Sequence, residues 1–197
     1  MPYESFTLSQ LQEKFALTYQ QTDKSFDHIA PQVPGDWLTG MLRRQAPLAV
    51  GKTSDKGRSE LLITPMLVAV RELRERQIML FSGERFDVDR KAGLFGCCNF
   101  LFTRGEVAGE ITAPVIAVVE ARKESNRGVP RCVAEMVAAQ RFNERAKHPA
   151  SPVYGAVTNG TLWRFLKLEG ATVTLDIQQF GISELPRILG ILYFMTS

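Results

Sequence analysis

The stretch APVIAVVEARKE, residues 113–124, contains the strongest structural pattern in this chain. Its run of Val and Ile has no polar break, which is typical of a strand buried on both faces of a sheet. The run ends in Glu120, and Arg122 follows two residues later. Because side chains alternate along a strand, we expect Glu120 and Arg122 to share one face and Lys123 to point away. Open α/β sheets often hold their sites at such strand ends.

Length and composition favour a single α/β domain. The chain has 197 residues, of which 45% are hydrophobic, and this is enough for a substantial core. The formal net charge of +3 is small and spread along the chain. It is compatible with nucleic-acid binding without arguing for it. We therefore predict one domain spanning residues 1–197.

The sequence also predicts where the protein resides and which stabilising groups it lacks. The N-terminus has no apolar core of the signal-peptide type, and no stretch is long and apolar enough to span a bilayer. Three cysteines, two of them adjacent, do not make a disulfide framework, and two distant histidines do not suggest a zinc site. These patterns predict a cytoplasmic protein that does not enter membranes.

Periodicity and turn residues give an order of elements. Asn159-Gly160 is the strongest hairpin pattern, residues 51–58 are expected to form a loop, and GVP at 128–130 is expected to interrupt the chain. We predict helices over 8–20, 36–45, 60–76, 131–146 and 183–195. Thr7 is expected to cap the first helix and Ser59 the third. The predicted strands are 77–82, 98–103, 113–121, 153–158, 161–170 and 171–177.

With Glu60 on the third expected helix and Glu120-Ala-Arg122-Lys123 ending the third strand, this order resembles the PD-(D/E)XK nuclease superfamily. The resemblance covers about residues 60–168. It implies an α/β, restriction-endonuclease-like core made of a helix, a three-stranded meander, a crossover helix and a strand, over residues 59–168. Residues 1–50 would then be an N-terminal helical addition, and residues 169–197 a C-terminal strand and helix, so that a hairpin and a helix close the chain.

The resemblance also assigns roles to residues. In the family, a helix Glu, a second-strand Asp and a third-strand acid bind Mg²⁺, and a Lys two residues later assists the attacking water. The matching metal positions here are Glu60, Asn99 and Glu120. The catalytic positions are Glu120, Arg122 and Lys123, and Gln140 matches a helix Gln that contacts nucleic acid in some subfamilies.

Two of these positions depart from the family pattern. Asn99 offers a carbonyl oxygen without the charge that anchors Mg²⁺, so any Mg²⁺ is expected to bind weakly. Arg122 stands where the family has Lys, and an arginine side chain is a poor proton acceptor, so Arg122 is expected to pair with Glu120. A bulge at the strand end would let Lys123 replace the family Lys, and Asp87 or Asp89 would be the substitute carboxylate.

Three functions follow as hypotheses. The first is a nuclease-fold protein with a degenerate metal site, acting as a binding or assembly module on DNA and forming a homodimer. The second is an active Mg²⁺-dependent nuclease that acts on DNA. The third is a structural or interaction protein without a nucleic-acid role, in which Glu60 only favours its helix start and Glu120 and Arg122 form surface ion pairs.

Overall fold

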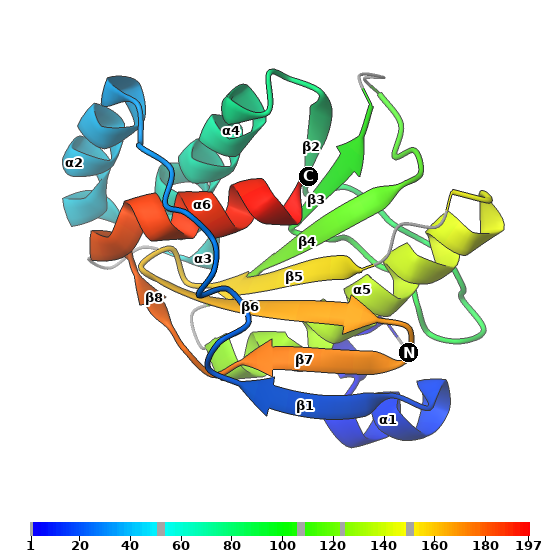
Figure 1. The fold of residues 1–197 in the computed structure, drawn as a ribbon. Coiled ribbons are helices and arrows are strands. Elements are labelled where there is room, and N and C mark those ends of the chain that lie inside the picture. Colours follow the sequence, from blue (N-terminus) through cyan, green and yellow to red (C-terminus); the bar gives the residue numbers. More distant parts are fainter. Residues whose placement is uncertain (1, 51–53, 106–108, 123–124, 149–151) are drawn as a thin grey trace.

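The computed structural model describes residues 2–50, 54–105, 109–122, 125–148 and 152–197. Its strands are β1 (Thr18–Thr22), β2 (Ile78–Ser82), β3 (Phe100–Arg104), β4 (Val115–Ala121), β5 (Val153–Thr158), β6 (Leu162–Glu169), β7 (Thr172–Asp176) and β8 (Phe180–Gly181). They form one mixed eight-stranded sheet in the order β1-β7-β6-β5-β4-β3-β2, with β8 paired to β6 (Figure 1).

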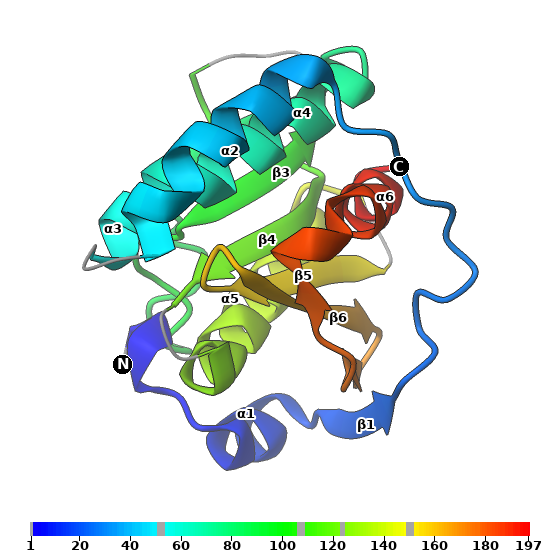
Figure 2. The same cartoon turned by 90° about the vertical axis from the view of Figure 1, so that its left-hand side faces the viewer.

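Helices cover both faces of this sheet. They are α1 (Leu8–Phe15), α2 (Asp36–Val50), α3 (Asp55–Arg58), α4 (Thr64–Leu73), α5 (Ser125–Arg145) and α6 (Leu185–Met195), with short helical turns at Tyr3–Ser5, Ser59–Ile63 and Ile182–Glu184. Figure 2 shows α2, α4 and α6 on one side of the sheet and α5 with α1 on the other. The expected α/β class is confirmed.

The centre of the sheet follows the expected order of elements. After α4, strands β2, β3 and β4 pair antiparallel, α5 crosses over, and β5 pairs parallel to β4. All seven residues of β4 are buried, as its unbroken apolar run predicted. The predicted turn at Asn159-Gly160 joins β5 to β6, which pair antiparallel. Gly160 has a φ of +89°, which explains the glycine at this position.

Two hydrophobic cores lie on the two faces. One packs Leu38 of α2, Met66 of α4 and Leu189 of α6 against the sheet. The other packs Leu11 of α1 and Val133 of α5 against the opposite face. Among the described helices, none combines the length and the apolar character needed to cross a bilayer.

The prediction of a helix over 8–20 was wrong in its second half. Thr7 caps α1 as expected, in a reciprocal capping box with Gln10. The helix ends at Phe15, because Ala16 adopts a left-handed φ of 53°. Strand β1 follows and pairs in parallel with β7, so residues 1–50 are not a purely helical addition but contribute a strand to the sheet.

The start of the third expected helix also differs. Residues 55–58, expected in a loop, form α3, whose cap is Ser54 and not Ser59. The Ser54 hydroxyl accepts a hydrogen bond from the Gly57 N–H. Ser59–Ile63 continues as a π-helical turn directly into α4, so Pro65 lies within the continuous helical segment. Residues 51–53 of the expected loop lie outside the described residues.

Two other helices are longer than expected. Helix α2 runs on to Val50 and contains Pro47. Helix α5 begins at Ser125 and contains Pro130, so GVP does not interrupt the chain there. The apolar face of α5 is buried against β4 and β5, and this packing outweighs the local cost of the proline.

Candidate functional site

Glu120 and Arg122 lie at the end of β4, on the face covered by α5. The Glu120 side chain is fully buried, whereas that of Arg122 is 36% exposed. Arg122 Nε donates a hydrogen bond of 2.7 Å to Glu120 Oε1. The expectation that these two side chains share a face is therefore confirmed, and so is the expected pairing between them.

A second guanidinium reaches the same carboxylate from α5. Arg131 Nε lies 3.2 Å from Glu120 Oε2, without the alignment of a hydrogen bond. It donates instead to Glu135 Oε1 at 3.0 Å, one helical turn along α5. Arg131 Nη2 donates to the Cys97 carbonyl at 2.6 Å, which ties α5 to the segment before β3. Arg131 is thus held between two carboxylates.

Glu135 is, like Glu120, a fully buried acid. Its side chain is inaccessible to solvent, and its Oε2 has no hydrogen-bond partner among the described residues. Burial, together with the nearby charge of Glu120, raises the pKa of Glu135 to about 8. Burial also raises the pKa of Glu120, although Arg131 and Arg122 act in the opposite direction. Two buried carboxyl groups therefore share one buried cation.

The N-terminal segment supplies the last charged group. Glu4 Oε1 accepts hydrogen bonds from Arg131 Nη1 at 2.6 Å and from Arg122 Nη2 at 3.4 Å. The neighbouring Tyr3 anchors this segment, because its hydroxyl donates to the Phe86 carbonyl at 2.6 Å. We call the resulting set the β4 cluster: Glu4, Glu120, Arg122, Arg131 and Glu135.

Gly128 allows α5 to approach the β4 cluster closely. A Cβ atom on Gly128 would lie 2.6 Å from Val157 Cγ1, 3.3 Å from Arg122 Cγ and 3.4 Å from Glu120 Cγ. Real Cβ contacts are longer than the first of these, so only glycine fits without a shift of the helix. The distance between α5 and the strand ends therefore depends on this residue.

Among the described residues, the three expected to bind a metal together do not line one common hollow. Glu60 and Asn99 line a hollow of about 400 Å³ beside α3 and α4, together with Ala121. Glu60 is 63% exposed and pairs with Lys56 at 3.7 Å. The Glu120 carboxylate lies on the α5 face instead. Across the described ranges, no group of three or more His, Cys, Asp or Glu side chains could hold a metal ion.

Asn99 has a structural partner. Its Oδ1 accepts a hydrogen bond of 2.9 Å from the Ala121 N–H, at the end of β4. Gln140 is also engaged, because its Nε2 donates to the Gly170 carbonyl at 3.0 Å. Gln140 lies on α5 about two and a half turns beyond Arg131, well away from the β4 cluster.

The remaining candidate residues are Lys123, Asp87 and Asp89. Lys123 lies outside the described residues. Asp87 pairs with Arg90 at 2.6 Å, and Asp89 pairs with Arg141 at 3.2 Å. Both acids thus belong to arginine pairs of the loop between β2 and β3 and of α5, and neither belongs to the β4 cluster.

Three members of the β4 cluster were not predicted from the sequence. Arg131 and Glu135 are four positions apart in RCVAEM, where Cys132, Val133 and Met136 are fully buried. A charged pair at this spacing within an apolar stretch was the pattern that could have identified them. Glu4 has no comparable pattern, because its contacts are with residues more than a hundred positions away.

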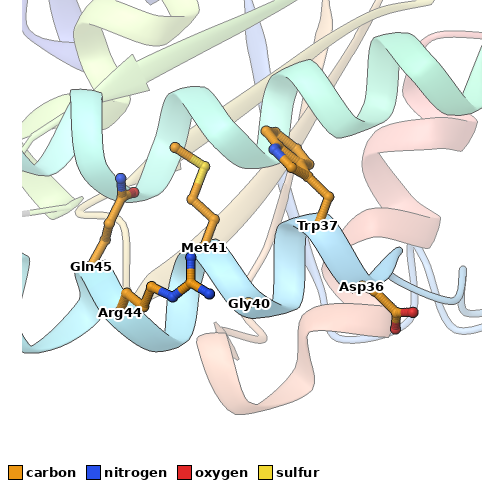
Figure 3. A pocket seen from close by; sticks show the side chains of 6 residues that line it. All are labelled: Asp36, Trp37, Gly40, Met41, Arg44 and Gln45. Atoms are coloured by element: carbon orange, nitrogen blue, oxygen red, sulfur yellow. The ribbon is translucent and has the colours of Figure 1, made fainter.

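A second hollow, of about 420 Å³, runs along α2. Trp37, Met41 and Gln45 point toward α4, whereas Asp36 points away (Figure 3). Its lining brings no set of charged side chains together, in contrast to the β4 cluster. It is therefore the weaker candidate for a chemical site.

No protein-family model matches the chain, and no curated protein matches it. The arrangement of its own residues is thus the basis for the functional argument.

Proposed function

We propose that this protein is a degenerate member of the PD-(D/E)XK nuclease superfamily, with a restriction-endonuclease-like core, that binds DNA phosphates at the end of β4 without metal-dependent hydrolysis. The observation that carries the proposal is the position of the Glu120 carboxylate between the guanidiniums of Arg122 and Arg131. The order α4, β2–β4, α5, β5 supports the proposed core.

The environment of Glu120 argues against a magnesium site. Mg²⁺ requires hard oxygen ligands with near-octahedral geometry and keeps several of its waters. The Glu120 side chain has no solvent exposure, and each of its oxygens faces a guanidinium. A divalent ion would have to displace two cations from a buried carboxylate. The other acids of the β4 cluster, Glu135 and Glu4, are themselves paired with Arg131.

The same two guanidiniums suit a phosphate group. Arginine presents a planar fork of N–H donors that matches phosphate oxygens, and it remains charged at all physiological pH values. Arg122 is partly exposed. The inner Arg131 is 9% exposed, and its Nη1 contacts Glu4, whose side chain is exposed. A phosphate at this point would contact both arginines while Glu120 and Glu135 hold the guanidiniums in place.

Homodimer formation stays part of the proposal. Trp37 and Leu48 on α2 are 54% and 63% exposed, so α2 leaves large apolar side chains accessible to a second copy of the chain. Sedimentation of the parent and of the Trp37→Glu variant tests whether the protein forms a dimer. We expect a dimer for the parent, and a monomer at every concentration would contradict this part.

Two assays on the same protein test the proposed function. The first measures the binding of a short fluorescein-labelled DNA duplex in EDTA, and the second measures cleavage of plasmid DNA with Mg²⁺ or Mn²⁺. We expect binding that does not require metal, and no cleavage. Metal-dependent cleavage that disappears in Glu120→Gln would favour the active nuclease. Absence of binding at low salt would favour a protein without a nucleic-acid role.

A further inference from the structure

A single oxygen atom of Glu4 bridges the two arginines of the β4 cluster. Glu4 Oε1 is 2.6 Å from Arg131 Nη1 and 3.4 Å from Arg122 Nη2. One non-bridging phosphate oxygen would accept hydrogen bonds from the same two donors in the same way. The carboxylate of Glu4 thus occupies the position that the proposed function assigns to a phosphate.

This carboxylate can leave without loss of the segment that carries it. The Glu4 side chain is 63% exposed, so it is solvated on its outer side. Tyr3 is 1% exposed, and its N–H donates to the Phe95 carbonyl while its hydroxyl donates to Phe86. Rotation of the Glu4 side chain therefore opens the two guanidiniums while Tyr3 keeps the backbone in place.

The outer side of the β4 cluster presents N–H donors of both arginines to an anion. Two guanidiniums face three carboxyl groups, and two of these, on Glu120 and Glu135, are buried on the inner side. Glu4 is the only acid of the cluster on the outer side. Once it leaves, the outer N–H groups of Arg122 and Arg131 have no acidic partner within the cluster, and an incoming anion takes its place.

We propose that Glu4 is an internal competitor for the phosphate site of Arg122 and Arg131, so that a phosphate-bearing ligand binds only as the Glu4 carboxylate is displaced. This inference rests on the proposed function, because it describes how the same site is regulated. Binding is therefore weaker in the parent protein than the two arginines alone would allow.

The test uses inorganic phosphate as its probe, with the arginine Nε–Hε signals of the full chain followed by NMR. Glu4→Gln keeps the size of the side chain and removes its charge. Glu13→Gln removes one exposed charge from α1, in the same N-terminal region, and is the matched control. We expect phosphate to shift the Arg122 and Arg131 signals, with a Kd about three- to tenfold lower in Glu4→Gln than in the parent or in Glu13→Gln.

Equal phosphate affinity in the parent and in Glu4→Gln would overturn the inference, and so would an equal gain in Glu13→Gln. The labelled DNA duplex separates this result from a failure of the proposed function. If phosphate binds more tightly to Glu4→Gln but DNA binds to neither protein, the role of Glu4 as a competitor is supported and the proposed DNA binding is rejected. If DNA binds both proteins and phosphate affinity is unchanged, the DNA function stands and the competitor is rejected.

Discussion

The Asn99 side chain holds the end of β4 through the backbone of Ala121. Asn99 Oδ1 accepts a hydrogen bond of 2.9 Å from the Ala121 N–H, next to the buried Glu120. A residue that the nuclease resemblance assigns to metal binding thus has a structural partner of its own. The contribution of Asn99 to the stability of the fold can therefore be measured separately from any role in metal binding.

Replacement of Asn99 should distinguish these roles. Asn99→Ala leaves the Ala121 N–H without its acceptor and should lower the free energy of unfolding by about 1–2 kcal/mol. Asn99→Asp keeps an acceptor oxygen and should cost less. Urea denaturation of the two variants measures the difference. Equal stability of Asn99→Ala and the parent would show that the hydrogen bond contributes little.

Introducing the residues of the nuclease pattern should not create a metal site. The double variant Asn99→Asp with Arg122→Lys supplies a carboxylate and a lysine. However, residue 99 lines the hollow beside Glu60, while the Glu120 carboxylate pairs with Arg131 of α5. We expect calorimetry with Mn²⁺ to detect no tight binding in either the parent or the double variant. Micromolar affinity in the double variant, abolished by Glu120→Ala, would show that these residues can gather around a metal.

The close approach of α5 should depend on Gly128. Gly128→Ala places a methyl group 2.6 Å from Val157 Cγ1 and should lower the free energy of unfolding by about 1–3 kcal/mol. Gly40→Ala in α2 is the control, because nothing lies within 4 Å of its added Cβ. This variant should gain about 0.5–1 kcal/mol. Urea denaturation measures both, and a stabilised Gly128→Ala would refute the packing argument.

Stability should fall as the pH rises through neutrality. Burial raises the pKa of Glu135 to about 8 in the folded protein, against about 4.3 in the unfolded chain. Between these two pKa values, the folded state keeps a proton that the unfolded state has lost. The contribution of Glu135 to the free energy of unfolding therefore declines between about pH 5 and about pH 8. Thermal unfolding across this range measures the decline.

Glu135→Gln is the matched variant for this pH dependence, because its amide cannot ionise. Its melting temperature should change less with pH than that of the parent. The raised pKa of Glu120 has the same sign and persists in the variant, so part of the slope should remain. Parallel curves for the two proteins would exclude Glu135 as a source of the slope.

Much of the centre of the fold was predictable because its patterns are local. The unbroken apolar run of β4 predicted a strand buried on both faces, and Asn159-Gly160 predicted the hairpin after β5. Alternation along β4 also predicted the pairing of Glu120 with Arg122. Each of these features depends on residues close together in sequence.

The errors arose where a local pattern was weak or tertiary contacts prevailed. The helical spacing of apolar residues continues past Phe15, but Ala16 adopts a left-handed conformation that its sequence does not suggest, and β1 then pairs with β7. Glu4 and Arg131 meet only because the N-terminal turn packs beside α5. Only two of the five members of the β4 cluster, Glu120 and Arg122, were therefore predicted from the sequence.

The salt dependence of DNA binding tests the central claim most directly. The affinity of a short labelled duplex is measured in EDTA over a range of salt concentrations for the parent, Arg122→Gln and Arg76→Gln. Arg76 lies just before β2, at the opposite end of the strands from Arg122, and serves as a control of equal charge. We predict binding to the parent, a slope of log K against log salt reduced by about 0.9 in Arg122→Gln, and a slope unchanged in Arg76→Gln. No binding to the parent at low salt, or equal slopes in all three proteins, would contradict the assignment of a phosphate site to Arg122.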